Sequence, residues 1–127
     1  MNIPKYEIGK VFIINTSKSL KHRSTKHCVC ISLGGNKFLL INTHHREMYD
    51  DFEIFATDYP FLKGNNRFIS CSHIMNFDDN ITIRSVGMLK YDDILKIKSK
   101  IENSTTLTRK DINEILLELE EWELDNS

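Results

Sequence analysis

The sequence lacks any apolar run long enough to cross a membrane. Its longest runs, such as residues 11–14 and 38–41, fall far below the roughly 18 to 20 residues that span a bilayer. The N-terminal segment also lacks a basic start followed by an apolar stretch, which a secretory signal requires. We therefore expect a protein that stays in the cytoplasm and makes no membrane contact.

Cysteine is also scarce, and its number is odd. The three cysteines are Cys28, Cys30 and Cys71. Because no framework spacing pairs them, we expect buried thiols in a reducing compartment and no structural disulfide. Cys71, His73 and the pair His44 and His45 carry atoms that bind zinc, but none of the strong zinc-site spacings occurs. We expect neither a metal nor another cofactor.

The length and composition are those of one ordinary folded domain. A chain of 127 residues can bury a real core but is too short for two ordinary domains. Hydrophobic residues make up 40% of the chain and charged residues 28%, which excludes a disordered protein. We expect residues 1–127 to form a single domain.

The net charge of −1 hides an uneven distribution. Seven of the 18 acidic residues lie in residues 111–127, where no Lys or Arg occurs. The 17 Lys and Arg of residues 1–110 therefore face 11 Asp and Glu, a net charge of +6 for this part. Such a basic body suggests contact with a polyanion, and an acidic helical extension at residues 107–127 would cover it or simply be well solvated.

Short β-rich runs separated by turn residues fill the sequence up to residue 87. The Gly-Gly-Asn turn at residues 34–36 predicts a hairpin, because Gly and Asn tolerate the positive φ of tight connections. The six runs cover residues 8–15, 29–33, 38–42, 52–56, 67–74 and 81–87. Six short strands with short turns predict a mainly β domain, either a small barrel or a sandwich.

Helical patterns follow the β-rich runs. Residues 91–101 begin with an acidic first turn and place Ile94, Leu95, Ile97 and Ile101 on one side. A second helix begins after Thr108, which resembles the N-cap of a capping box with Asp111 in place of Glu. On its apolar stripe, Trp122 is either an anchor of the core or of an interface, or a platform for stacking a base. The sequence thus predicts a β-barrel first and two α-helices last.

Basic and imidazole side chains gather around the predicted hairpin. Either His22 or His27 can act as base or acid, because imidazole titrates at about pH 6.5. Arg23 and Lys26 would hold a phosphate, and Thr43 with His44 would face them from the far end of the hairpin. The remaining candidates for RNA contact are Lys18, Lys21, His44, His45, Arg67 and His73. The alternative is a charged loop that is merely solvated.

The order of several segments points to a known family. Residues 61–101 contain a strand, an apolar turn segment at residues 73–78, and Gly87-Met88-Leu89 before an acidic helix start. Earlier in the chain, Gly9-Lys10-Val11-Phe12 and residues 28–32 match more loosely. Over about residues 6–101 the chain resembles the MazF/PemK family of toxin endoribonucleases, and Thr43 matches the Thr that ends the third strand of that family.

This resemblance implies a fold, a reaction and partners. It implies an SH3-like barrel that forms a homodimer, binds a cognate antitoxin and cleaves single-stranded RNA without a metal. In this chemistry a ribose 2′-hydroxyl attacks the adjacent phosphate, so the site needs a base, an acid and cations for the phosphorane charge.

The chain departs from the family at two places. Lys26-His27, or the displaced Arg23, stands where the family has Arg-Pro, and Ser70-Cys71-Ser72 stands where some members place Arg and Asp around a Cys. These departures predict an alternative function, a catalytically inactive barrel that binds a protein or a nucleic acid.

Overall fold

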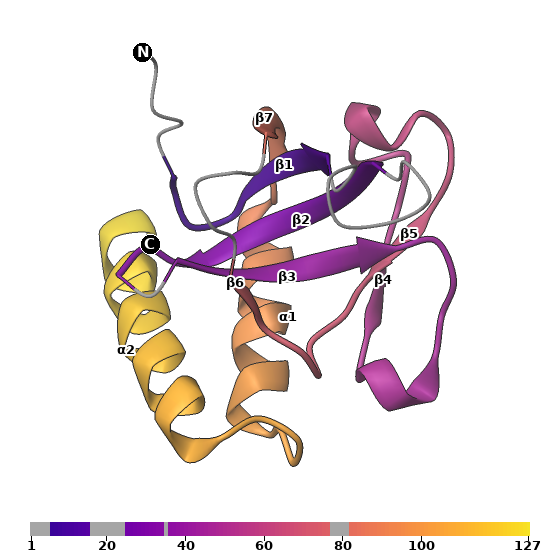
Figure 1. The fold of residues 1–127 in the computed structure, drawn as a ribbon. Helices are drawn as coiled ribbons and strands as arrows, with labels where there is room; N and C mark the ends of the chain where they lie inside the picture. The colour runs from indigo at the N-terminus through magenta and orange to yellow at the C-terminus, as the bar shows by residue number, and fades with distance from the viewer. Residues whose placement is uncertain (1–5, 16–24, 35, 77–81) are drawn as a thin grey trace.

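The protein folds as one antiparallel β-sheet followed by two α-helices (Figure 1). The computed structural model describes residues 6–15, 25–34, 36–76 and 82–127. The strands are β1 Lys10–Asn15, β2 Thr25–Ser32, β3 Lys37–Asn42, β4 Phe52–Ile54, β5 Arg67–Ile69, β6 Met75–Asn76 and β7 Thr82–Met88. The helices are α1 Tyr91–Glu102 and α2 Arg109–Asn126, with short 3₁₀ turns η1 Glu47–Tyr49 and η2 Pro60–Leu62. The predicted mainly β fold with two C-terminal helices is confirmed.

The sheet is curved, and its two ends approach each other. Its strand order is β4-β5-β3-β2-β1-β7, and β6 pairs separately with β3. Within the described ranges no pairing joins β4 to β7, so closure into a barrel stays a prediction. The connection from β4 to β5 nevertheless reaches β7, because a Cβ on Gly87 would lie 2.6 Å from the Phe61 ring.

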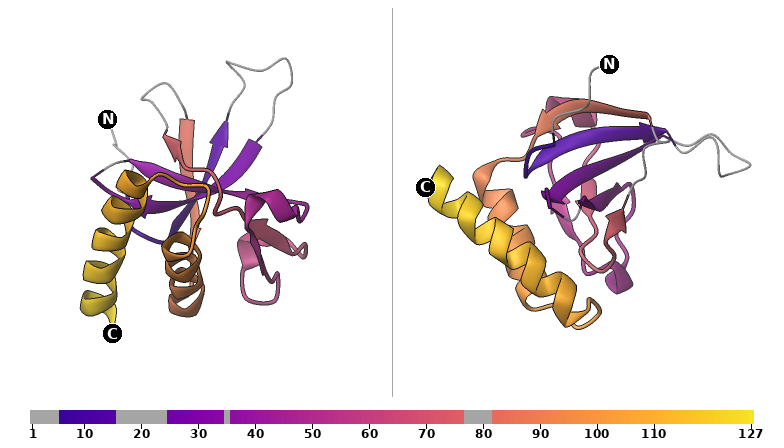
Figure 2. Two further views of the ribbon diagram at one scale, coloured as in Figure 1. Left: turned by 90° about the horizontal axis from the view of Figure 1, so that it is seen from below. Right: turned by 60° about the vertical axis from the view of Figure 1, so that its left-hand side comes forward.

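Each face of the sheet is covered by a hydrophobic cluster. Helices α1 and α2 lie side by side against one face (Figure 2). That face holds the larger core, to which Val29 and Ile31 belong, and the opposite face holds a smaller core that contains Cys28 and Cys30. Because neighbouring side chains of a strand point to opposite faces, these four residues of β2 contribute alternately to the two clusters.

The hairpin and the helices follow their local signals. Strands β2 and β3 pair antiparallel, and Asn36 in their connection has φ 51°, which Asn tolerates at little cost. Helix α1 buries Ile94, Ile97 and Ile101, and α2 begins at Thr108, whose side chain accepts a hydrogen bond from the Asp111 N–H.

The predicted strand at residues 67–74 is too long. Strand β5 ends at Ile69, because the N–H groups of Cys71 and Ser72 donate to the Tyr49 carbonyl instead of to a neighbouring strand. A separate short strand, β6, then pairs with the start of β3. The first strand is also shorter than predicted, since β1 begins at Lys10 and not at residue 8.

In the part of the chain that the structure describes, neither helix has the length and apolarity of a membrane span.

Candidate functional site

The two histidine-bearing segments of the sequence meet at the open end of the β2–β3 hairpin. In the antiparallel pairing His27 of β2 lies opposite Ile41 of β3, so the residues after Asn42 leave β3 close to the start of β2. Strand β5 lies beside the same end of the hairpin, because its Phe68 is opposite Asn42. We call this end of the sheet the His27 corner. Lys26, His27, Thr43 and Arg67 are therefore brought to one end of the sheet.

His27 lies against an aromatic ring and near two cations. Its imidazole stacks on Phe61 with ring centroids 6.1 Å apart and an angle of 24° between the planes. Burial, and then the positive charges of Arg67 and Lys63, lower the pKa of His27 from its usual 6.5. The ring is therefore neutral at pH 7 and able to accept a proton.

Phe61 is held in place from several sides. Its ring packs on Tyr59 at 5.4 Å between centroids and against the backbone of β7 at Gly87, where a side chain would not fit. The Tyr59 hydroxyl donates to the Asp93 carboxylate and accepts from the Lys90 N–H at 2.9 Å. Burial raises the pKa of Tyr59, so the phenol stays protonated and continues to donate. The start of α1 thus fixes the ring that supports His27.

Lys63 lies in the connection between β4 and β5, and Arg67 lies at the start of β5. Lys63 has φ 53° at the end of η2, and Arg67 is the first residue of β5. The half-buried Arg67 keeps its Nε without a hydrogen-bond partner among the described residues. A buried donor left unpaired costs roughly 1 to 3 kcal/mol, which an anionic ligand would offset. The His27 corner is thus suited to hold a phosphate beside a neutral imidazole.

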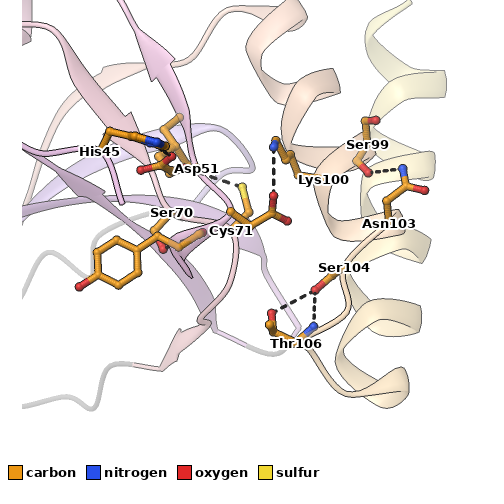
Figure 3. Close-up of polar contacts among 12 residues, drawn as sticks. His45, Asp51, Ser70, Cys71, Ser99, Lys100, Asn103, Ser104 and Thr106 are labelled. Carbon is orange, nitrogen blue, oxygen red and sulfur yellow. Dashed lines mark hydrogen bonds and ion pairs between the residues drawn. The ribbon is translucent and has the colours of Figure 1, made fainter. Parts of the chain in front are cut away.

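His45 forms a second arrangement on the segment after β3. Its Nδ1 lies 2.5 Å from Asp51 Oδ1, and the Arg46 N–H donates to Asp51 Oδ2 at 3.1 Å. The Asp51 side chain is fully buried, whereas 57% of the His45 side chain is exposed. Figure 3 shows His45 pointing at Asp51, near the buried Cys71. The carboxylate holds one ring nitrogen of an imidazole whose side chain is more than half exposed, an arrangement also found in sites for proton transfer.

The other predicted residues are less closely placed. Thr43, His44 and Lys26 are exposed at the same end of the hairpin. His73 is exposed and lies 3.0 Å from Ser72 Oγ, on the segment that leads to β6 and so to the opposite end of β3. The structure therefore does not bring His73 to the His27 corner. Lys18, Lys21, His22 and Arg23 lie outside the described residues.

Three residues of the site were missed by sequence reasoning. Phe61 and Lys63 come near His27 only through the path of the β4–β5 connection, which no local pattern reveals. Asp51 follows another acidic residue directly before a predicted strand, where an acidic side chain is normally solvated. The complete burial of its side chain beside a histidine depends on the tertiary fold.

The cysteines are structural in this fold. All three are buried and free of disulfides. Burial raises the pKa of Cys28, Cys30 and Cys71 to about 12, so these thiols are protonated and unreactive near neutral pH. Within the described ranges, no three side chains of His, Cys, Asp or Glu come together as ligands of a metal.

Comparison of the chain with protein-family models, with curated proteins and with solved structures found no match.

Proposed function

We propose that the protein is a MazF/PemK-like toxin that binds single-stranded RNA at the open end of the β2–β3 hairpin and cleaves it without a metal. One observation carries this proposal: a half-buried His27 with a lowered pKa lies near Arg67 and Lys63 and stacks on Phe61. A neutral base beside two cations is the combination that attack on a phosphate requires. A homodimer and an antitoxin partner belong to the same proposal, because they accompany the family resemblance.

His27 is the proposed general base. It takes the proton of a ribose 2′-hydroxyl, whose oxygen then attacks the adjacent phosphorus and forms a new P–O bond. Arg67 and Lys63 stabilise the negative charge of the phosphorane. The bond to the 5′ oxygen breaks, and this oxygen takes a proton from an acid, for which His22 is the candidate from the sequence. The products are a 2′,3′-cyclic phosphate and a 5′-hydroxyl.

The second candidate function is binding without cleavage. The segment Ser70-Cys71-Ser72 stands where some members of the family carry charged residues, and here it is buried and bonded to the Tyr49 carbonyl. These side chains have structural roles and supply no charged group for catalysis. The His27 corner would then hold the phosphates of a nucleic acid and leave them intact.

Incubation of the full chain with a mixed-sequence single-stranded RNA in excess EDTA tests the proposal. Native protein should cut the RNA, and His27→Gln should lower the rate by about 10²- to 10⁴-fold, the usual contribution of a general base. His22→Ala combined with Arg23→Ala should also abolish the cut. Arg67→Gln should weaken RNA binding and cleavage.

Lys110→Gln is the matched control for Arg67→Gln, because it removes one positive charge from an exposed position of α2. Its cleavage and binding should equal those of the native protein. Tight RNA binding that depends on Arg67 but gives no product would establish the binding module. RNA that is neither bound nor cut would remove both functions.

A further inference from the structure

A cavity of about 570 Å³ lies far from the His27 corner. It is lined by the C-terminal half of α2, the start of α1, the end of β7 and the residues before β1. Leu33, just beyond the end of β2, also lines it, which places the cavity at the turn end of the hairpin. Pockets for small organic ligands have volumes of roughly 300 to 1,000 Å³, so this cavity is large enough for several side chains of a ligand.

The charge of the cavity is negative. Its lining includes Glu7, Glu118, Glu121 and Asp125 and, among the described residues, no Lys, Arg or His. Glu118 is already used by the fold, since its carboxylate accepts hydrogen bonds from the Ser32 hydroxyl and from the N–H groups of Leu33 and Gly34.

The other three carboxylates of the wall are Glu7, Glu121 and Asp125. Across the described part of the chain, none of Glu7, Glu121 and Asp125 forms an ion pair, although Lys37, Lys98 and other lysines pair with other acidic residues. Among the described residues, no positive charge therefore balances the acidic wall of the cavity.

Aromatic and apolar side chains form the rest of the wall. The rings of Tyr91 and Trp122 stack with centroids 5.3 Å apart and an angle of 27° between their planes. Met88 and Leu33 at the edge are 44% and 49% exposed, which is unusual for large apolar side chains in a chain with two well-filled cores. An indole is the best aromatic partner of a cation, and an apolar edge beside carboxylates suits a ligand that has both an apolar stem and a positive head.

We propose that this cavity binds an arginine side chain carried by a basic segment of a partner protein. A guanidinium group is planar, stacks on aromatic rings and bonds carboxylates with two parallel donors, so Trp122 with Glu121 and Asp125 offers both of its preferred contacts. The exposed Met88 and Leu33 take the apolar neighbours of the arginine in the partner segment. The site goes beyond the proposed RNA chemistry, since its negative charge would repel a phosphate backbone.

The single tryptophan of the chain makes the test direct. Because Trp122 lines the cavity, its fluorescence reports occupancy without a label. The probe is a blocked hexapeptide of alternating leucine and arginine, compared with the same peptide in which neutral citrulline replaces arginine. The arginine peptide should change the fluorescence in a saturable way and bind about tenfold or more tightly than the citrulline peptide, a difference of about 1.4 kcal/mol.

Two double variants locate the binding on the molecule. The double variant Glu121→Gln with Asp125→Asn should bind the arginine peptide about tenfold more weakly than the native protein does. Glu102→Gln with Glu120→Gln changes the net charge equally at exposed positions outside the cavity and should leave binding unchanged.

The proposal is overturned by equal affinity for the arginine and citrulline peptides, by no saturable change, or by equal weakening in both double variants. Spermidine that binds as tightly as the peptide would assign the cavity to a free polyamine and would also overturn it.

Discussion

At the scale of single residues, His27 shows how a fold changes the chemistry of a side chain. Its sequence neighbours Lys26 and Cys28 reveal nothing about its titration. Burial lowers its pKa most, and the charges of Arg67 and Lys63, which are about 40 residues away in the sequence, lower it further. The ring of Phe61 covers part of the imidazole, and burial removes water from the charged form. A histidine in this position is kept neutral by three independent contacts.

This lowered pKa predicts how the stability of the protein depends on pH. The folded state binds a proton to His27 only below the usual 6.5, whereas the unfolded chain binds it at about that value. Between the two pKa values the unfolded state holds more protons, so the free energy of unfolding rises with pH through this window and falls as the pH drops below 6.5. Urea unfolding measured at about pH 5 and about pH 7.5 should show lower stability at the acidic value, and His27→Gln should reduce the difference.

His44→Gln is the control for this measurement, because His44 is exposed at the same end of the hairpin. It should keep the pH dependence of the native protein. If His27→Gln also kept the native pH dependence of stability, the acid sensitivity would come from other groups. The inference that the surroundings of His27 keep its imidazole neutral would then be wrong.

At the scale of elements, the start of α2 is set by one side chain. The Thr108 hydroxyl accepts from the Asp111 N–H at 3.2 Å and so pairs one of the free donors of the first turn. The Asp111 carboxylate itself lies 3.6 Å from Lys37 Nζ and so links the first turn of α2 to the start of β3. Thr108→Ala should therefore lower the free energy of unfolding by about 1 kcal/mol, measured by urea denaturation. Thr105→Ala, in the exposed loop before the helix, should change it by much less.

Elements with local signals were predictable, and elements that depend on distant partners were not. The β2–β3 hairpin and both helices follow from a turn sequence and from apolar spacing, which are properties of adjacent residues. The strand predicted over residues 67–74 stops at Ile69, because Tyr49 supplies the hydrogen-bond acceptor for the next residues. The same distinction holds for the candidate site. His27 and Arg67 were predicted from their chemistry, whereas the places of Phe61 and Lys63 depend on the path of the connection between β4 and β5.

At the scale of the whole molecule, α2 is part of the main core. Charge alone suggests a removable acidic cover over a basic body. In the fold, however, α2 buries Ile112, Ile115 and Leu119 in the same cluster as the sheet and α1. Its acidic residues also bind the turn end of the hairpin: Glu114 lies 3.3 Å from the largely buried Lys37, and Glu118 accepts from the backbone after β2.

Deletion of residues 104–127 should therefore unfold the protein. Full burial of a large aliphatic side chain stabilises a fold by about 1.5 to 3 kcal/mol, and the total stability of a domain is only about 5 to 15 kcal/mol. Loss of the three buried side chains of α2 would remove a large share of that total and would expose their partners on α1. The shortened chain should show no cooperative thermal transition by circular dichroism.

Deletion of only residues 124–127 gives the matched comparison, because all four are exposed at the end of α2. This shorter deletion should melt at nearly the temperature of the full chain. A chain without residues 104–127 that still melted cooperatively and bound RNA more tightly would mean that α2 is a detachable acidic cover. The buried isoleucines and the ion pairs of Lys37 favour the opposite result. A helix that contributes side chains to the hydrophobic core of the sheet cannot dissociate without exposing that core.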